Sequence, residues 1–518
     1  MRKITTIFGF LFLFSSLIVA QGEIDALRFS REDLYGTARA MSMGGAFGAL
    51  GGDMTGVTIN PAGIAVYRSS EVVGTLNISN ERSSVGSNNA NRTRFDMDHL
   101  GFVGYFPLRN SVVPLINFGF SYNQTKSFDK EVLALGNTNS SLMSFIANRS
   151  HGIDPQNLMR GDNLPDPFLT EAWLPILGFN SGLIYPENGT GPAYLPLNIG
   201  SENIQDEIFT RELGYINNYD FTVGTTLNGV LNLGLSLSIK DVSYSLTSEY
   251  LEDFADGGYT LFNWLTTSGA GVSAKFGAIY RPINELRIGL SYHTPTWYAL
   301  TMTYDAEMVH DLEAYAGDGY EPGGIYSERF INHYDLKSPG KLVASAAGVL
   351  GSRFIVSMDY EMVNYSNMRL GVPSNSADSQ NWFDIDNEYI EQDFKPTSTV
   401  KLGMEYRFTP QMYGRLGYAW MQNPYETDAV ELAEAGVAGS NTIFRMEGDT
   451  NYFTGGLGYR FNRNFYLDAA IVYKTQNDDL YAFPRVYSAG SGDLLVDSAP
   501  YSLKNNSIRG LITLGYRF

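Results

Sequence analysis

SIRGLITLGYRF, residues 507–518, ends the sequence in strict two-residue alternation. In an extended strand, apolar side chains such as Ile508 and Tyr516 lie on one face, and Arg509 lies on the other. A strand in a membrane wall needs this pattern, because one face meets lipid and the other meets a lumen. A soluble sandwich alternates as well, but it gives no reason to end the last strand on an aromatic residue, Phe518. The stretch therefore predicts an all-β transmembrane barrel.

The other end of the sequence predicts export. Residues 1–20 have Arg2 and Lys3 followed by the apolar run Ile7–Ala20, which is typical of a secretory signal peptide cleaved after Ala20. Outside this segment no run of 18 or more apolar residues could form a membrane-spanning helix. The sequence has no cysteine, which excludes disulfides, an N-terminal lipid anchor and thiolate metal sites.

Alternating segments recur along the whole sequence and predict a closed antiparallel barrel of about 14 strands. We expect strand cores to begin near Glu71, His99, Leu115, Asp220, Leu231, Gly271, Leu286, Lys341, Arg353, Thr397, Gln411, Tyr452, Phe465 and Ser507. The connections between them alternate between short and long, as periplasmic turns and outer loops do in such barrels. We expect three parts: a signal peptide at 1–20, an N-terminal hatch at 21–69 and the barrel at 70–518.

The hatch is predicted from ARAMSMGGAFGALGGDMTGVTINPAGIA, residues 38–65. Its glycines weaken helices by about 1 kcal/mol each relative to alanine, so the segment cannot form a core of its own. Asn60, Pro61, Ala62 and Gly63 have the composition of a tight turn. We therefore expect the segment to fill the lumen as a plug, with this turn as its gate.

The composition of the chain argues against several classes of function. The net charge of −19 argues against a nucleic-acid partner, because phosphates would be repelled. The five histidines form no metal-binding or catalytic motif, so we expect no enzyme activity, no metal and no cofactor. Carboxylates gather in two outer loops, at 305–336 and 384–388. We interpret them as a solvated surface, with calcium binding as the alternative.

The connection from Lys126 to Tyr219 is longer than is needed to join two strands, so we expect it to have a structure or function of its own. It contains two apolar segments with helical spacing, and a similar piece at Leu261–Leu265 is expected in the next outer loop. These segments either pack on one another or line a groove that receives apolar molecules. The candidate groove residues are Leu142, Phe145, Ile146, Trp173, Leu174, Leu177 and Phe179.

The sequence resembles the FadL/OmpP1/TodX family of outer-membrane transporters of hydrophobic compounds. ARAMSMGGAFGAL followed by TINPAGIA is similar to the family's hatch signature, and only Asn60, Pro61 and Ala62 can be carried over residue by residue. The segments at 338–368, 401–420 and 455–473 resemble three of its hairpins. The outer loops match weakly.

The resemblance implies a fourteen-stranded barrel plugged by a hatch, in the outer membrane of a Gram-negative bacterium. It also implies passive transport of long-chain fatty acids or aromatic compounds. The ligand is captured in an outer groove, passes to a lumenal pocket and leaves after the hatch moves, in some members sideways through the wall. Some relatives act in protein export or surface attachment, which is the alternative. We expect a monomer that contacts outer-membrane lipid and is inserted by the barrel-assembly machinery through the strand ending in Phe518.

Overall fold

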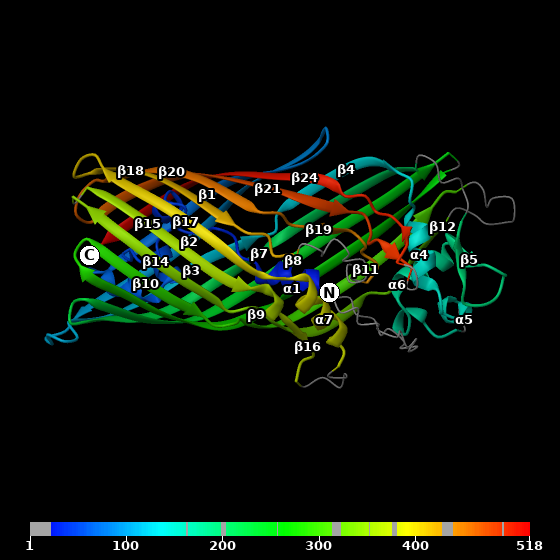
Figure 1. The fold of residues 1–518 in the computed structure, drawn as a ribbon, viewed down its shortest axis with the longest axis horizontal. Coiled ribbons are helices and arrows are strands. Elements are labelled where there is room, and N and C mark those ends of the chain that lie inside the picture. The colour runs from blue at the N-terminus through cyan, green and yellow to red at the C-terminus, as the bar shows by residue number, and fades with distance from the viewer. Residues whose placement is uncertain are drawn as a thin grey trace, which may run out of the picture.

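The computed structural model is a tall β-barrel with helices inside it and across one end (Figure 1). It describes residues 22–161, 164–197, 204–255, 257–312, 323–351, 353–374, 381–426, 439–488 and 492–518. The expected signal peptide lies outside these residues. No helix among them has the length and apolar character needed to cross a membrane.

Antiparallel pairs connect the wall strands in chain order, and the sheet closes where the first strand, β1, pairs with the last, β24. Two wall strands are each built from two segments, β10 with β11 and β13 with β14, and counting each as one gives the expected 14. The wall strands are β1 (Glu71–Val85), β2 (Asn88–Pro107), β3 (Leu115–Ser127), β7 (Ile204–Leu227), β8 (Leu231–Phe254), β9 (Gly257–Ile283), β10 (Leu286–His293) with β11 (Trp297–His310), β13 (Phe330–Lys337) with β14 (Lys341–Leu350), β15 (Phe354–Asn364), β17 (Pro396–Arg407), β18 (Met412–Met421), β20 (Thr450–Arg460), β21 (Phe465–Tyr481) and β24 (Tyr501–Arg517).

The remaining elements extend the barrel sheet, lie in the lumen or cover the outer end. The short strands are β4 (Lys130–Thr138), β5 (Ile184–Pro186), β6 (Tyr194–Pro196), β12 (Gly323–Tyr326), β16 (Arg369–Gly371), β19 (Phe444–Met446), β22 (Val486–Tyr487) and β23 (Leu494–Val496). The helices are α1 (Glu23–Ser30), α2 (Ala38–Met41), α3 (Met54–Ile59), η1 (Pro61–Val66), α4 (Leu142–Ser150), α5 (Pro155–Leu158), η2 (Pro167–Leu169), α6 (Trp173–Asn180), η4 (Tyr365–Asn367) and α7 (Asp384–Asp393).

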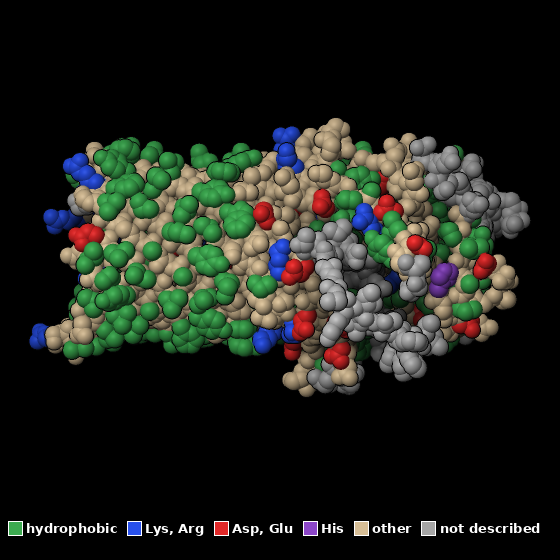
Figure 2. Space-filling model, viewed as in Figure 1, with side chains coloured by type: hydrophobic (Ala, Val, Ile, Leu, Met, Phe, Trp, Pro, Cys, Tyr) green, Lys and Arg blue, Asp and Glu red, His purple; other side chains and the backbone are tan. Residues whose placement is uncertain are grey.

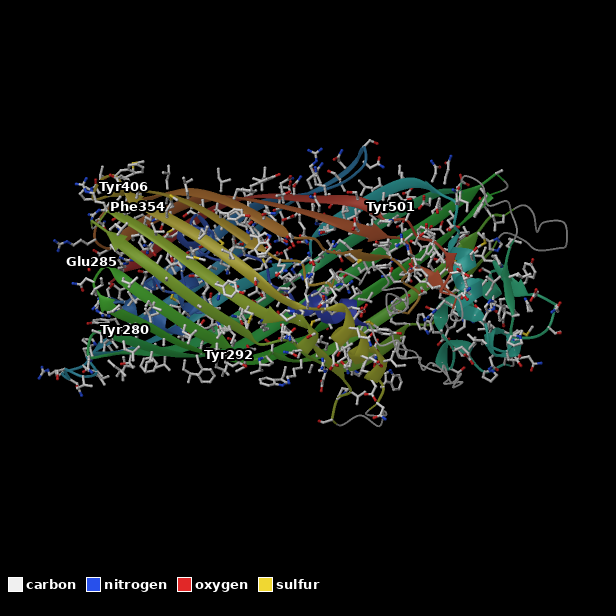
Figure 3. All side chains as sticks on the ribbon, viewed as in Figure 1. Tyr280, Glu285, Tyr292, Phe354, Tyr406 and Tyr501 are labelled. Carbon is white, nitrogen blue, oxygen red and sulfur yellow. The ribbon has the colours of Figure 1, made fainter. Side chains whose placement is uncertain are left out.

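The alternation expected of the last strand is confirmed. Ile508 and Tyr516 are 55% and 52% exposed, whereas Arg509 is buried in the lumen. Figure 2 shows that hydrophobic side chains cover the outside of the barrel over the half that carries the short turns. Phe354 and Tyr406, which pair across neighbouring strands, lie at the end of this half in Figure 3. An apolar band with aromatic residues at its edge is the lipid-facing surface of an outer-membrane barrel.

Strands β7, β8 and β9 extend far above the apolar band, with 24, 24 and 27 residues. The expected loop from Lys126 to Tyr219 is therefore partly strand, and the helical piece expected at Leu261–Leu265 is wrong. That segment lies within β9 and pairs with β8 on one side and β11 on the other. Alternate residues of the segment face the lumen, so its apolar content follows a period of two.

The segment from Glu23 to Tyr67 contains the helices α1, α2, α3 and η1, which lie inside the barrel (Figure 1). It contacts the wall strands at several glycines. A Cβ at Gly234 in β8 would collide with the carbonyl group of Pro61. A Cβ at Gly277 in β9 would collide with the side chain of Asn60. Glycine in the interior of a strand normally lowers stability. At these two positions it is required because the hatch lies directly against the strand backbone.

The wall is interrupted at one height in two neighbouring strands. Residues 294–296 separate β10 from β11, and residues 338–340 separate β13 from β14. Each gap contains a proline, Pro295 or Pro339, which has no N–H to donate to the sheet. Across the gap the Thr296 backbone N–H donates to the Ser338 hydroxyl at 2.9 Å, and the Ser338 N–H donates to the Thr296 carbonyl at 2.9 Å.

We predict that Gly234→Val displaces the hatch without preventing barrel formation, because the added side chain needs the space of Pro61. Outer membranes that carry this variant should admit small polar dyes faster than those with the wild type, while heat-modifiable migration on gels shows a folded barrel. Gly510→Val is the matched control, because a Cβ at Gly510 in β24 meets nothing within 4 Å. Equal dye entry for both variants would contradict a hatch sealed by close contact.

Candidate functional site

The turn expected at Asn60–Gly63 is formed and lies against the wall. The Asn60 side-chain amide donates to the carbonyl of Gly48 at 2.9 Å and to the carbonyl of Ala278 in β9 at 3.2 Å. Its side-chain oxygen accepts from the N–H of Ala62 at 3.1 Å, which starts η1 at Pro61. One asparagine thus joins two parts of the hatch and the barrel, and it needs both the donor and the acceptor of its amide to do so.

The hatch also makes side-chain contacts around the circumference. Asp359 in β15 accepts from the N–H groups of Phe47 and Gly48 at 3.0 and 2.9 Å. Arg39 forms an ion pair of 3.2 Å with Glu405 in β17. The carbonyl of Ile59 accepts from the Ser291 hydroxyl at 2.8 Å and lies 2.8 Å from the His293 ring nitrogen, close to the interruption between β10 and β11.

Three consecutive charged residues in the first part of the hatch, Arg31, Glu32 and Asp33, form ion pairs with distant parts of the chain, and we call them the charged strap. Arg31 pairs with Glu447 at 2.8 Å. Glu32 pairs with Lys240 and Lys341 at 2.6 and 2.8 Å. Asp33 pairs with Lys474 at 2.9 Å and accepts from the Tyr452 hydroxyl at 2.8 Å. The charged strap was not expected from the sequence. Inward-facing lysines such as Lys240 and Lys474 were its only signal.

Residues of the charged strap line two lumenal cavities. The first has a volume of about 120 Å³ and is lined by α1, by apolar residues such as Leu27 and Phe128, and by charged groups. The second, of about 140 Å³, is lined by the hatch residues Thr58 and Ile59 and by both edges of the wall interruption. Drug-sized ligand pockets have volumes of roughly 300–1,000 Å³, whereas about 150 Å³ is enough for benzene.

The predicted groove residues lie together, but they do not line an open groove. Leu142, Phe145 and Ile146 are on α4, which begins after a serine cap, Ser141, whose hydroxyl accepts from the Met143 N–H at 3.1 Å. Trp173, Leu174 and Leu177 are on α6. These six side chains are at most 2% exposed and belong to one core, with Phe179 partly buried against it. A groove here stays a proposal, and it requires α4 and α6 to separate.

The N-terminal helix α1 meets the outer-loop helix α7 through carboxyl groups. Glu23 is fully buried, and neither of its side-chain oxygens accepts a hydrogen bond in the described part of the chain. Burial, and next the nearby Asp393, raise the pKa of Glu23 well above its usual value. Burial raises the pKa of Asp386 to about 7. These groups are therefore protonated in the folded state at pH values where free carboxyl groups are ionised.

The described residues of the acidic loops hold no recognisable ion site. Asp384–Glu388 forms the start of α7. Within the described residues, no group of three or more histidine, aspartate or glutamate side chains could hold a metal ion. Residues 313–322 of the other acidic loop lie outside the described part of the chain.

Comparison with known proteins identifies the barrel. The family model described as outer membrane protein transport protein (OMPP1/FadL/TodX) matches residues 255–499. The expected family resemblance is confirmed. The chain has the fold of the FadL/TodX outer-membrane transport channels, which agrees with the location expected from the sequence. The matched range does not include residues 38–65, so the hatch signature is not part of this match.

Solved structures agree on the fold. A Pseudomonas aeruginosa FadL homologue has 12% sequence identity and a TM-score of 0.52, with 94% of this chain and 99% of that chain covered. A mutant of the monoaromatic hydrocarbon channel TodX that lacks S2 has 12% identity and a TM-score of 0.51, with 93% and 98% covered. A search of curated protein sequences gave no significant match.

We predict that Asn60→Asp loosens the hatch, because a carboxylate would face the carbonyl oxygens of Gly48 and Ala278 in place of a donor. Loss of these buried hydrogen bonds should weaken hatch docking by about 2–3 kcal/mol. Faster proteolysis within residues 38–65 of the purified barrel would show that the hatch is docked more weakly. Asn462→Asp is the control, because the Asn462 side-chain oxygen accepts hydrogen bonds from the N–H groups of Asn464 and Phe465, and aspartate accepts them too. Equal proteolysis of both variants would contradict the anchoring role.

We also predict that the contact between α1 and α7 weakens as the pH rises. The folded-state pKa values of Glu23 and Asp386 lie above those of the unfolded chain, so their contribution to stability is complete at low pH and is lost as pH increases towards 7. Hydrogen exchange of α1, corrected for the intrinsic pH dependence, should accelerate between pH 5 and pH 7. Asp393→Asn should reduce this acceleration. A pH-independent opening rate in the wild type would refute the prediction.

Proposed function

We propose that the chain carries hydrophobic compounds passively across the outer membrane. The observation that supports this best is the second cavity, which touches both the hatch and the interruption of the wall. Ile59 of the hatch contacts Ser291 and His293, directly before the gap that follows β10. A shift of this turn would therefore join a lumenal cavity to an exit through the wall.

The volumes of the two lumenal cavities indicate which compounds fit without rearrangement of the lumen. In the closed arrangement the two cavities match a single aromatic ring better than a long acyl chain. A chain of twelve carbons requires α1 or the charged strap to move. Such movement is favoured by burial of apolar ligand surface, which contributes about 25 cal/mol per Å². Both aromatic compounds and fatty acids thus remain candidates, and they differ in how much of the lumen must rearrange.

The outer end offers the capture site in this proposal. Helices α4 and α6 carry the predicted groove residues and cover the end of the barrel (Figure 1). Separation of the two helices would expose an apolar surface to which a poorly soluble compound binds by partition. Asn60, Pro61, Ala62 and Gly63 then act as the gate between the lumen and the exit.

Uptake with a locked wall tests the proposal. A strain that lacks this chain should take up labelled dodecanoate or toluene more slowly, and the wild-type chain should restore uptake. The double variant Thr296→Cys with Ser338→Cys, in a chain free of other cysteines, would bridge the interruption under oxidising conditions. We expect uptake to fall to the level of the deletion strain and to recover after reduction.

The matched control places the same bridge in intact sheet, at Leu290→Cys with Ala344→Cys, which are paired residues of β10 and β14. This pair should leave uptake unchanged. Normal uptake through the oxidised Thr296/Ser338 pair would reject the exit at the interruption. Unchanged uptake in the deletion strain, together with loss of a secreted cargo, would reject transport and favour a role in protein export.

A further inference from the structure

A cavity of about 320 Å³ lies at the opposite end of the hatch from the lumenal cavities, at the periplasmic mouth of the barrel. Its lining combines hatch residues from 50–52 and 66–69 with the ends of wall strands that carry the short turns. Five arginines line it and no aspartate or glutamate does. The chain has 55 acidic and 36 basic residues, so this sign of charge is opposite to that of the whole protein. We name this cavity the arginine pocket.

Two of the five arginines have carboxylate partners outside the arginine pocket. Arg39 pairs with Glu405 at 3.2 Å, and Arg517 pairs with Glu71 at 2.5 Å. These pairs compensate two charges. They leave the positive charges of the other three arginines, Arg68, Arg287 and Arg460, without an acidic partner within 4 Å in the described residues.

The three remaining arginines bind only neutral groups. Arg68 donates to the carbonyls of Ala65 and Tyr67 at 2.7 and 3.0 Å. Arg287 donates to the carbonyl of Leu50. Arg460 lies over the ring of Tyr413, 5.1 Å from its centre. Carbonyl oxygens and an aromatic face satisfy donors in part, but they do not neutralise a guanidinium charge.

Arg287 gives the second, independent observation. Its Nε–H is out of contact with solvent and has no acceptor among the described residues. Arg281, Arg39 and Arg68 are close enough to repel its charge. A buried donor without an acceptor, surrounded by like charges, costs free energy that an oxyanion would recover.

We propose that the arginine pocket binds an oxyanion, a phosphate or carboxylate group that reaches it from the periplasm, and that this anion bridges the hatch to the wall. Arg39 and Arg68 belong to the segment that precedes β1, whereas Arg287, Arg460 and Arg517 belong to wall strands. Arginine is suited to this role because its planar donors bind phosphate and carboxylate in pairs. Without the anion the two sets of arginines repel, and with it they hold the hatch closed.

Binding is tested on the purified full-length barrel in an uncharged detergent, independently of any transported compound. The variant Ser69→Cys places one thiol in the lining of the arginine pocket of a chain that has no other cysteine. Inorganic phosphate should slow maleimide labelling of this thiol about tenfold at ten times its Kd. Chloride of equal ionic strength is the reference, and Ser87→Cys, in the turn between β1 and β2, is the control thiol.

Variants of the arginines test whether phosphate protects the thiol by binding in the arginine pocket. Arg68→Gln with Arg287→Gln should remove the protection by phosphate, whereas Arg463→Gln, in an exposed turn outside the pocket, should retain it. Equal protection in all variants, or no protection beyond that of chloride, would overturn the proposal. Thermal unfolding of each variant without phosphate shows whether the barrel is intact.

Two further arms identify the source of the anion and its effect. Dodecanoate that protects at far lower concentration than acetate would indicate an amphiphile whose chain contacts the apolar lining, such as Val66 and Ile355. Equal protection by acetate and dodecanoate would indicate a free small anion. In liposomes, phosphate should slow the efflux of a polar dye through the wild type but not through Arg68→Gln with Arg287→Gln. Protection without slower efflux would reject the bridging role.

Discussion

Asn60 and Pro61 closely approach two glycines of the wall, and the rest of the structure depends on this contact. Gly234 and Gly277 let the hatch backbone touch the strands, so the lumen is closed there without a thick layer of side chains. Everything else is arranged around that seal. The two small cavities and the charged strap lie above it, and the arginine pocket lies below it.

The wall was predictable because a membrane imposes a simple rule on it. Lipid on one face and a lumen on the other force a period of two, which is visible in residues such as Ile508 and Arg509, and short turns fix where the strands begin. How far the strands extend above the membrane was not predictable. Strands β7 to β9 continue through Leu261–Leu265 because they pair with one another, and no lipid is needed to keep them extended.

The candidate site was predictable only where it is formed by residues close together in the sequence. The turn at Asn60 has its own proline and glycine, and the serine cap of α4 precedes its helix directly. The charged strap and the arginine pocket join residues that are hundreds of positions apart, such as Glu32 with Lys341. Alternation tells which side chains face the lumen, but it does not tell which of them meet there.

The distribution of hatch contacts restricts how the barrel is assembled. The segment before β1 contacts β9 through Asn60, β15 through Gly48 and β17 through Arg39, which are strands spread around the circumference. A finished, sealed cylinder offers no lateral path by which such a segment could be threaded into all these contacts. We therefore expect the sheet to close around its own N-terminal segment, so that β24 pairs with β1 only after this segment is in place.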